Sequence, residues 1–549
     1  MAMTMPSEGR SSDAPSDRCG YTVRYFEREF WASDVCCWRE SWLDHEHCFW
    51  HAKTNGKTSN DIPTDSQDRL ERLDGAYLPN ISIEEFPLTE ESTLNSANLR
   101  GIQAPNTDLS NWVLNGANLF EVDLRDSNLC RSELRTADLS NANLEGADLS
   151  GAHLRQAQIA NTEFSEVNAT VCSAPGAKFH GSELKGTDFT SAYLEEVIFR
   201  GGNIDDAIFT SAQMQDCDFE SASVQESDFC YSVLSDSIFT DCNLSRTDFS
   251  HADLSSTDFT DCSATEAEFT DIDGLNCDFQ STSVPYSDFS EAYLRHSGFK
   301  NATAINTDFS GSEASHADFS HASLDEATFR NSQLRHATFQ DSTLCRANFE
   351  DVDLRGGNLD NTSLVGTVFE DVLLDEDSNI GEIKEDSPED AVTVYRKIIR
   401  LLKENSLDYL IPEYRIKERK MKEKELYKNS QYLSGFTYTL LGLTSSYGER
   451  PRRVIISSGI TILIFAAVFS VLGRVSELSI QALDGYLTNY FSEMIGQALG
   501  GLYFSVSSFV GLKPSSQSSL VHFLSVWTTL AGTLLMALLI FSLGRIATR

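Results

Sequence analysis

The chain has 549 residues, 41% of them hydrophobic, and a formal charge of −39 from 43 basic and 82 acidic side chains. This length exceeds what one ordinary core supports, so we expect several units or an extended array. The hydrophobic content excludes a wholly disordered chain, and the charge disfavours nucleic-acid binding because phosphate would be repelled. An acidic, lysine-poor surface is typical of a protein kept soluble in concentrated salt.

The N-terminal residues 1–18 are rich in Ser, Pro and Asp and contain no apolar stretch, so we expect a disordered tail and no secretory signal. The following soluble part of the chain is therefore expected in the cytoplasm. All twelve cysteines of the chain lie in this part, and they should then be reduced thiols rather than a disulfide framework.

Residues 19–60 form a Cys- and Trp-rich module, and residues 61–93 a connecting segment and cap. The Cys48-x-x-His51 spacing resembles half of a zinc site. The tetrahedral set that we predict is Cys19, Cys37, Cys48 and His51, with Cys36 as a rival for Cys37 and His45 and His47 as further rival ligands. The alternative is a reduced, tryptophan-packed cap that closes the first coil of the following region, because a bare coil end is an open sheet edge.

Residues 94–374 hold one register, in which every fifth residue from Leu94 is apolar over 57 consecutive positions, with Gly274 as the exception. We call these the centre positions. Two residues before each stands a small or β-branched residue, with Trp112 as a bulky exception. The core that we predict includes Leu139, Leu149, Phe189, Phe229, Phe249, Phe289, Phe319 and Phe349.

A period of five matches neither a helix nor an alternating strand, so the chain must turn a corner at every repeat. If four sides close one coil, residues 20 apart stack at roughly 4.8 Å, and the repeats give about 14 coils. Between Phe179 and Phe349 the centre positions alternate Phe with another residue. Ten residues are half a coil, so we expect the phenylalanines to form two opposite stacked ladders.

Runs such as residues 137–149, with the sequence ADLSNANLEGADL, resemble the pentapeptide repeat family over about half of the chain. The resemblance implies a right-handed quadrilateral β-helix. It does not imply one function, because such repeats serve as scaffolds, targeting modules and, in a few cases, DNA mimics. Five cysteines fall in the small inward phase, where we expect them to pack as small hydrophobes: Cys172, Cys217, Cys242, Cys262 and Cys277.

After the repeats we expect an acidic linker at residues 375–390 and basic juxtamembrane helices at 391–453. Ser387 before Pro388 predicts a helix that runs to about Asn405, and a second helix is expected at 409–431. Residues 396–453 carry 14 basic and 7 acidic side chains, which reverses the sign of the repeat region. This pattern fits a solvated helix face, but we favour attraction to anionic lipid headgroups.

Residues 454–549 are predicted to form a transmembrane hairpin. The segment 454–473 has no charge, and 520–544 has only His522 as an ionisable residue, so both are long enough to span a membrane. Arginines precede the first segment and follow the second. Under the positive-inside rule both ends are cytoplasmic, so we expect a multi-pass protein of the cell membrane with a cytoplasmic solenoid.

Between the two spans, residues 491–512 are apolar, rich in Gly and Ser, and suited to a re-entrant helix and loop. The order of span, loop and span resembles the pore domain of two-helix potassium channels. That family's filter reads Thr-Val-Gly-Tyr-Gly-Asp, and only Val510-Gly511 corresponds here, which argues against potassium selectivity. The pore-lining candidates are Ser507, Ser508, Val510 and Gly511.

The sequence contains no phosphate-binding loop, catalytic triad or zincin motif, so we expect a protein that is not an enzyme. The first hypothesis is a channel-like homo-oligomer whose solenoid docks a cytoplasmic protein and biases the pore. The second is a membrane-tethered interaction scaffold without conduction. The third is a DNA mimic, motivated by residues 201–294, where Arg246 is the one basic residue. No cofactor is expected besides Zn²⁺.

Overall fold

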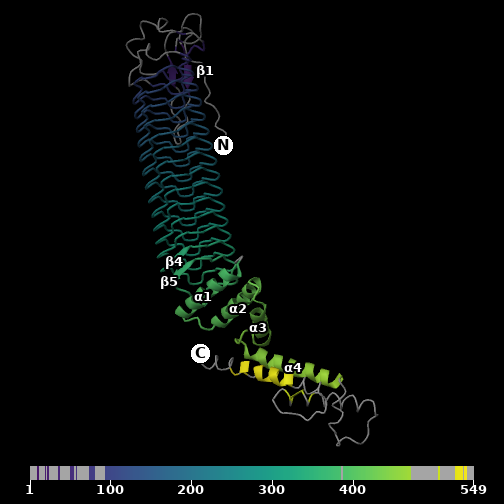
Figure 1. The fold of residues 1–549 in the computed structure, drawn as a ribbon. Coiled ribbons are helices and arrows are strands. Elements are labelled where there is room, and N and C mark those ends of the chain that lie inside the picture. Colours follow the sequence, from purple (N-terminus) through teal and green to yellow (C-terminus); the bar gives the residue numbers. More distant parts are fainter. Residues whose placement is uncertain are drawn as a thin grey trace, which may run out of the picture. The chain divides into compact units, whose positions relative to one another are not determined.

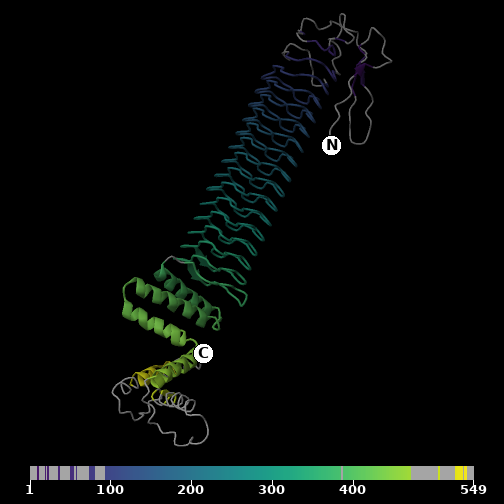
Figure 2. The same cartoon turned by 90° about the vertical axis from the view of Figure 1, so that its right-hand side faces the viewer.

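The computed structural model describes residues 9–10, 19, 21–23, 35–37, 48, 50–54, 57, 73–80, 93–384, 387–471, 502, 505–506, 508, 526–535, 537–538 and 540. The chain divides into two compact units, Met1–Lys384 and Glu385–Arg549. The first is a stack of coils and the second a group of helices (Figures 1 and 2).

The first unit is a β-solenoid in which each coil pairs in parallel with the coil 20 residues away. Isolated bridges such as Asp138↔Gln158 recur at this offset from Thr93↔Val113 to Thr343↔Ser363. The backbone N–H of Leu139 donates to the carbonyl of Gln158 at 2.7 Å, and that of Gln158 donates to the carbonyl of Ala137 at 2.9 Å. The expected four-sided coil of 20 residues is therefore confirmed.

The corner of each side is formed by the residue two places after the centre position, which has a positive φ. Gly146 (φ 69°) occupies one such corner, but Asn141 (56°), Tyr231 (58°) and even Val171 (50°) occupy others. A left-handed conformation costs a β-branched residue roughly 1–2 kcal/mol. The pairing of each coil with both neighbours compensates for this cost, so the corner tolerates residues that a lone turn would exclude.

The core of the solenoid consists of the centre positions, and all eight predicted core residues have no exposed surface. Phenylalanines 20 residues apart stack, with ring centroids 4.4 Å apart for Phe219 and Phe239. Phenylalanines ten residues apart meet edge to face across the bore, as Phe219 and Phe229 do at 5.9 Å. The two expected ladders are therefore present, and they also contact each other in the geometry that aromatic rings prefer.

The small residues two places before each centre position also form hydrogen bonds. Where they are Ser, Thr or Cys, most donate a hydrogen bond to the carbonyl of a centre residue one coil before: Thr187 Oγ1 to Phe164 O at 2.7 Å, and Cys217 Sγ to Leu194 O at 3.0 Å. These hydrogen bonds provide a donor to backbone carbonyl oxygens that are buried in the solenoid. Cys172 is fully buried in the bore, as expected for a packing residue, and this burial raises the pKa of its thiol to about 12.

The coils extend beyond the predicted limits at both ends. Residues 73–80 form an earlier coil segment, in which Tyr77 pairs with Asn98, and the last bridges are Asn358↔Asn379 and Thr362↔Ile383. These pairs have an offset of 21, so one inserted residue shifts the phase and hides the terminal coils from a strict period of five. Much of the expected acidic linker at 375–390 is therefore solenoid. Strands β4 (Asn348–Glu350) and β5 (Val368–Glu370) pair in this last part.

Before the coils, strands β1 (Gly9–Arg10), β2 (Tyr21–Val23) and β3 (Val35–Cys37) form an antiparallel sheet in the order β1-β2-β3. Gly9 and Arg10 pair with Thr22 and Tyr21, where the sequence predicted a disordered tail. The reason is the free edge of β2, which offers backbone donors and acceptors that a neighbouring extended segment can satisfy.

The second unit contains α1 (Pro388–Glu404), α2 (Ile411–Lys428), α3 (Tyr432–Ser445) and α4 (Pro451–Val471). The predicted helix after Ser387 is confirmed, with Pro388 in its first turn. The region expected to form one helix at 409–431 is α2, and α3 follows it after a short break. α1 packs on α2, and an ion pair between Arg396 and Glu418 at 2.8 Å joins them.

Among the described residues, α4 is the one helix that is long and apolar enough to cross a membrane. A shorter apolar helix, Val526–Leu535, lies within the predicted second span. Val454 of α4 packs on Leu535, with Ile462 and Leu538 beside them. The two-span hairpin stays a prediction, because much of residues 472–525 and 541–549 lies outside the described residues.

Candidate functional site

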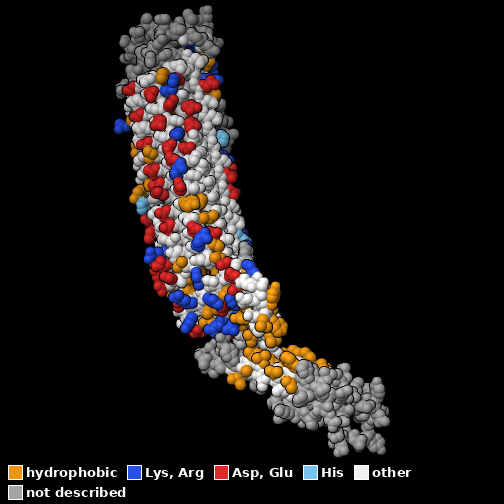
Figure 3. Space-filling model, viewed as in Figure 1, with side chains coloured by type: hydrophobic (Ala, Val, Ile, Leu, Met, Phe, Trp, Pro, Cys, Tyr) orange, Lys and Arg blue, Asp and Glu red, His pale blue; other side chains and the backbone are white. Residues whose placement is uncertain are grey.

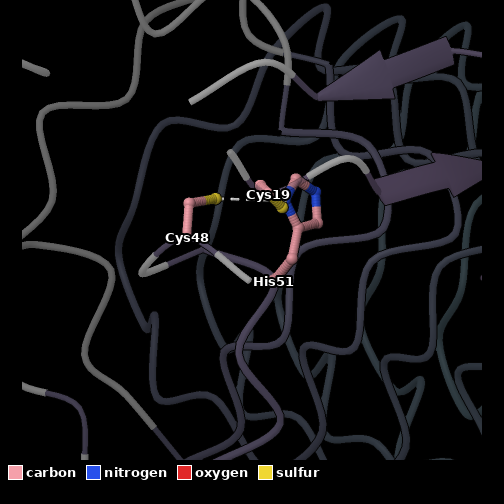
Figure 4. Close-up of side chains that lie close together, drawn as sticks. All are labelled: Cys19, Cys48 and His51. Carbon is pink, nitrogen blue, oxygen red and sulfur yellow. Dashed lines mark hydrogen bonds between the residues drawn. The ribbon is translucent and has the colours of Figure 1, made fainter. Parts of the chain in front are cut away.

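Three of the four predicted zinc ligands come together at the N-terminal end of the solenoid unit (Figure 4). The sulfurs of Cys19 and Cys48 lie 3.3 and 3.2 Å from Nδ1 of His51. All three ligand atoms lie within 4.8 Å of one another, and all three residues are buried. The arrangement joins residues 32 positions apart in the chain, so it is a product of the fold and not only of the Cys48-x-x-His51 spacing.

The tautomer of His51 follows from its second nitrogen. Nε2 lies 2.9 Å from the carbonyl oxygen of Asp74, which can only accept a hydrogen bond, so Nε2 carries a proton. In the neutral ring Nδ1 then has a lone pair directed at the two sulfurs. A histidine whose far nitrogen is held by a carbonyl is the usual orientation of a metal ligand.

The cluster is attached to the first coil through its backbone. Tyr77 N donates to Trp50 O at 2.6 Å, and the ammonium of Lys57 donates to Tyr77 O at 2.6 Å. Burial lowers the pKa of Lys57 to about 8, and the nearby Cys48 acts in the opposite direction. Trp50 is itself almost fully buried, so the segment is a packed cap of the coil as well as a candidate metal site.

The fourth predicted ligand, Cys37, is described only in its backbone. It is the last residue of β3 and pairs with Tyr21, two residues after Cys19, whereas its rival Cys36 pairs with Thr22. Cys37 is therefore paired with the residue of β2 that is nearest to Cys19 in the sequence. His45 and His47, the other rivals, lie outside the described residues.

A second group with metal-ligand chemistry, Asp228, Cys230 and Asp248, lies on the side of the solenoid. Here the thiol of Cys230 donates to Asp248 Oδ2 at 3.1 Å. Burial and the two flanking carboxylates raise the pKa of this thiol, which disfavours the thiolate that a metal requires. We therefore regard this group as part of the surface decoration of the repeats.

The side surface of the solenoid is acidic, with carboxylates spread over the face in view in Figure 3. Its arginines are mostly paired with carboxylates on the same or a neighbouring coil, as Arg200 is with Asp218 at 2.6 Å. One hollow of about 320 Å³ differs, since it is lined by Arg295, Arg335, Glu313, Ser315, Gln333 and two imidazoles, His316 and His336. His296, His316 and His336 stack there at ring distances of 4.9 and 4.8 Å.

The helices of the second unit expose apolar side chains to an unusual degree, and these gather over α3 and α4 in Figure 3. On α3, Leu433 is 82% and Leu443 71% exposed, and on α4 Leu463 is 63% exposed. Val526, Trp527, Leu530, Leu534 and Ile540 continue this surface on the C-terminal helix. We call this set the apolar surface.

Of the predicted pore-lining residues, Ser508 is described, whereas Ser507, Val510 and Gly511 lie outside the described residues. Ser508 is helical and buried, and its carbonyl accepts a hydrogen bond from Thr529 Oγ1 at 2.7 Å. Nearby, Ser505 Oγ donates to the carbonyl of Ile462 in α4 at 2.7 Å. The segment around 505–508 is thus bonded to both apolar helices.

Two family models match the chain. One, described as pentapeptide repeat region, matches residues 212–289 and 286–364, and the other, described as pentapeptide repeats (8 copies), matches 92–131, 117–156, 162–201, 175–210 and 187–225. These matches cover most of the coils and end before α1.

Similar solved structures include HetL, a pentapeptide repeat protein involved in heterocyst differentiation regulation from the cyanobacterium Nostoc sp. strain PCC 7120, at 23% identity over 48% of this chain and 89% of that chain, with a TM-score of 0.17. QnrB1, a plasmid-mediated fluoroquinolone resistance protein, matches at 20% identity over 41% of this chain and 92% of that chain, with a TM-score of 0.17. Rfr23 from the cyanobacterium Cyanothece 51142 matches at 16% identity over 29% and 90%, with a TM-score of 0.10. A comparison with curated proteins gave no match.

Proposed function

We propose that this chain, whose repeat region belongs to the pentapeptide repeat family, is a non-enzymatic interaction scaffold that its C-terminal helices attach to a membrane. The observation that carries the membrane part is the apolar surface. Each fully exposed Leu or Ile side chain in water forgoes roughly 1.5–3 kcal/mol of burial. Several such residues on α3, α4 and the C-terminal helix are typical of a lipid or protein interface.

Lipid is the better occupant of this surface for two reasons. α4 has the length and mean hydropathy of a membrane span, whereas a helix that docks on a protein usually keeps one polar face. In addition, Arg452 and Arg453 stand exposed in the first turn of α4, and α2 carries a run of lysines and arginines. Basic residues at this position favour the anionic leaflet of the cytoplasmic side.

The solenoid is the proposed docking surface for a protein partner. Its coils present polar side chains at fixed spacing, and a rigid, regular array suits recognition of an extended partner. The carboxylates of the described coils recur as repeat decoration and do not form an isolated acid–base pair in a cleft, which supports a binding role over catalysis.

The membrane proposal is tested by placing charges on the apolar surface. Ile460 and Ile464 lie one turn apart on α4, and both are more than half exposed. The double change Ile460→Lys and Ile464→Lys should move the full chain from the membrane fraction to the carbonate-soluble fraction, because each lysine near the middle of a span costs roughly 2.5–3.5 kcal/mol. Thr393→Lys with Tyr409→Lys, at exposed sites of α1 and its following loop, is the matched control and should stay in the membrane.

If the unaltered chain is released by carbonate as readily as the double variant, the attachment to membrane is wrong. A release of both double variants would have the same consequence for the role of α4, because the added charge alone would then explain the effect.

A second candidate function is a channel-like pore. The observation that favours it is the segment around 505–508, which is bonded to α4 through Ser505 and to the C-terminal helix through Thr529. Helical residues that are bonded to two apolar helices are expected of a re-entrant pore segment. Ionic current through the purified oligomer in planar bilayers tests it, and a stable oligomer without current would leave the scaffold.

A further inference from the structure

We propose that Cys19, Cys48 and His51, with Cys37 as the fourth ligand, bind a structural Zn²⁺ ion that closes the N-terminal end of the solenoid. The proposal does not depend on the membrane attachment or on the partner of the solenoid. It rests on the geometry of the cluster, on the tautomer of its histidine and on its place at the first coil.

The distances fit a metal better than they fit hydrogen bonding alone. The neutral Nδ1 has one lone pair, yet two sulfurs approach it, at 3.3 and 3.2 Å. One lone pair cannot serve two thiol donors well. With Zn–S bonds of about 2.3 Å and a Zn–N bond of about 2.0–2.1 Å, a tetrahedral ion separates S and N by roughly 3.6 Å. The ligand atoms would therefore need to move apart by only a few tenths of an ångström.

The donors select the metal. Two or three thiolates with one imidazole are the ligands of structural zinc, whereas Mg²⁺ and Ca²⁺ prefer oxygen. The carbonyl of Asp74 fixes His51 in the tautomer that presents Nδ1, and Asp74 is itself held by Asn95, whose N–H and side-chain amide both donate to Oδ1 at 3.0 Å. The first coil thus supplies the outer contacts that orient a ligand.

The position of the cluster indicates what a bound ion would stabilise. The N-terminal strands β2 and β3 are three residues each, too short to form a core of their own. A metal that joins Cys19 before β2 to residues 48–51 and to the first coil would fasten this small sheet to the solenoid. Such a cross-link covers the open edge at which unprotected coils pair with other chains.

Cys37 is preferred to Cys36 because of its register. Cys37 pairs with Tyr21, the residue of β2 that is nearest to Cys19 in the sequence. Cys36 pairs with Thr22, one residue further along the strand.

The test begins with the metal content of the full chain, purified in detergent without chelator. We expect one zinc per chain, and Co²⁺ replacement should give the intense visible bands of a tetrahedral thiolate site. Cys48→Ser and Cys37→Ser should lower the zinc content to near zero. Cys36→Ser and Cys172→Ser are the matched controls and should keep it, because Cys172 lies in the solenoid core. A chain without zinc that also fails to take up Co²⁺ would overturn the site.

Two substitutions of His51 separate a ligand from a packing residue in case a variant folds poorly. His51→Cys supplies another zinc ligand and should keep the metal, whereas His51→Gln preserves a hydrogen-bond donor toward Asp74 and should lose it. If the glutamine variant kept zinc and the cysteine variant lost it, His51 would not be a ligand. Loss of zinc from Cys36→Ser with retention in Cys37→Ser would overturn the assignment of the fourth ligand.

Discussion

The centre positions are the residues at which sequence and structure agree most closely. A buried ring in a bore of fixed width has neighbours above, below and opposite, so Phe229 contacts Phe209, Phe249, Phe219 and Phe239. The burial of each centre residue can therefore be predicted from its place in the five-residue period. This is why the core could be predicted residue by residue without any knowledge of the remote coils.

Phe229→Ala should reduce the free energy of unfolding of the solenoid by about 3–5 kcal/mol, because the stacked neighbours cannot collapse into the cavity. The control is Tyr286→Ala, which removes a ring that is 62% exposed and should change stability by about 0.5 kcal/mol or less. Denaturant unfolding of the full chain, followed by the β signal in circular dichroism, measures both. Equal effects would mean that the ladders do not carry the stability of the coils.

The pKa of the Asp353 carboxyl is a property that the five-residue period does not predict. Hydrogen bonds from Arg355 and Arg335 lower the pKa of its carboxyl to about 2. A carboxyl with a lowered pKa stabilises the fold above its ordinary pKa of 3.8, and this contribution is lost as the pH falls from about 4 to about 2. Asp353→Asn should therefore be less stable than the unaltered chain at pH 7 and equally stable near pH 2.

The measurement is the unfolding midpoint of both chains across this pH range. In a background where Arg335 and Arg355 are both replaced by Gln, the Asp353→Asn change should have little effect at any pH. A difference that persisted unchanged to pH 2 would show that the charge of Asp353 is not its source.

At the scale of the coil side, the sequence predicted the inward direction of the small residues but not their hydrogen bonds. The small and β-branched residues at this position indicate a limit on side-chain volume. The structure adds a chemical reason, since Thr247 Oγ1 donates to Val224 O at 2.6 Å, and Thr257 Oγ1 donates to Leu234 O at 3.0 Å. Polarity at a buried small position was the signal that could have revealed it.

Thr247→Val keeps the shape of the side chain and removes the donor. We expect a loss of about 1–3 kcal/mol, because the buried carbonyl of Val224 loses its bond to the hydroxyl. Thr247→Ser retains the hydroxyl and should lose less. The comparison by denaturant unfolding decides the point, and a valine variant as stable as the original would return the role of this position to packing alone.

The ends of elements were harder to predict than their interiors. A single inserted residue shifts the pairing from 20 to 21 at both ends of the solenoid, so a fixed period stops before the coils do. The metal-like cluster was partly predictable, because Cys48 and His51 are close in sequence. The contribution of Asp74 was not, since a backbone carbonyl leaves no mark in the sequence.

At the scale of the whole molecule, the main property is the net negative charge, most of which lies in the repeat region. The repeat region, residues 94–374, carries 46 acidic and 15 basic side chains, so most carboxylates have no arginine or lysine to pair with. The parallel register stacks some of them directly: Asp228, Asp248, Glu268, Asp288 and Asp308 follow one another along one side of the solenoid. Burial and the neighbouring Asp248 and Asp288 raise the pKa of Glu268.

Salt should therefore stabilise the solenoid. Ion pairs such as that of Arg335 with Asp353 at 2.6 Å are in direct contact, so salt weakens them less than it weakens repulsion along the column, which acts over several coils. The screening length falls from about 10 Å at 0.1 M to about 3 Å at 1 M salt, which removes most of that repulsion. The unfolding midpoint of the solenoid should rise over this range of sodium chloride.

Glu268→Gln separates charge repulsion from a general salt effect, because it removes one carboxylate from the middle of the column and keeps its shape. At low salt the variant should be more stable than the unaltered chain, and the gain should shrink toward 1 M, where the column is already screened. A midpoint that falls with added salt would mean that the paired arginines outweigh the unpaired carboxylates. In that case Glu268→Gln should show no gain in stability at low salt, because repulsion from the neighbouring Asp248 and Asp288 would contribute little to the stability of the coils.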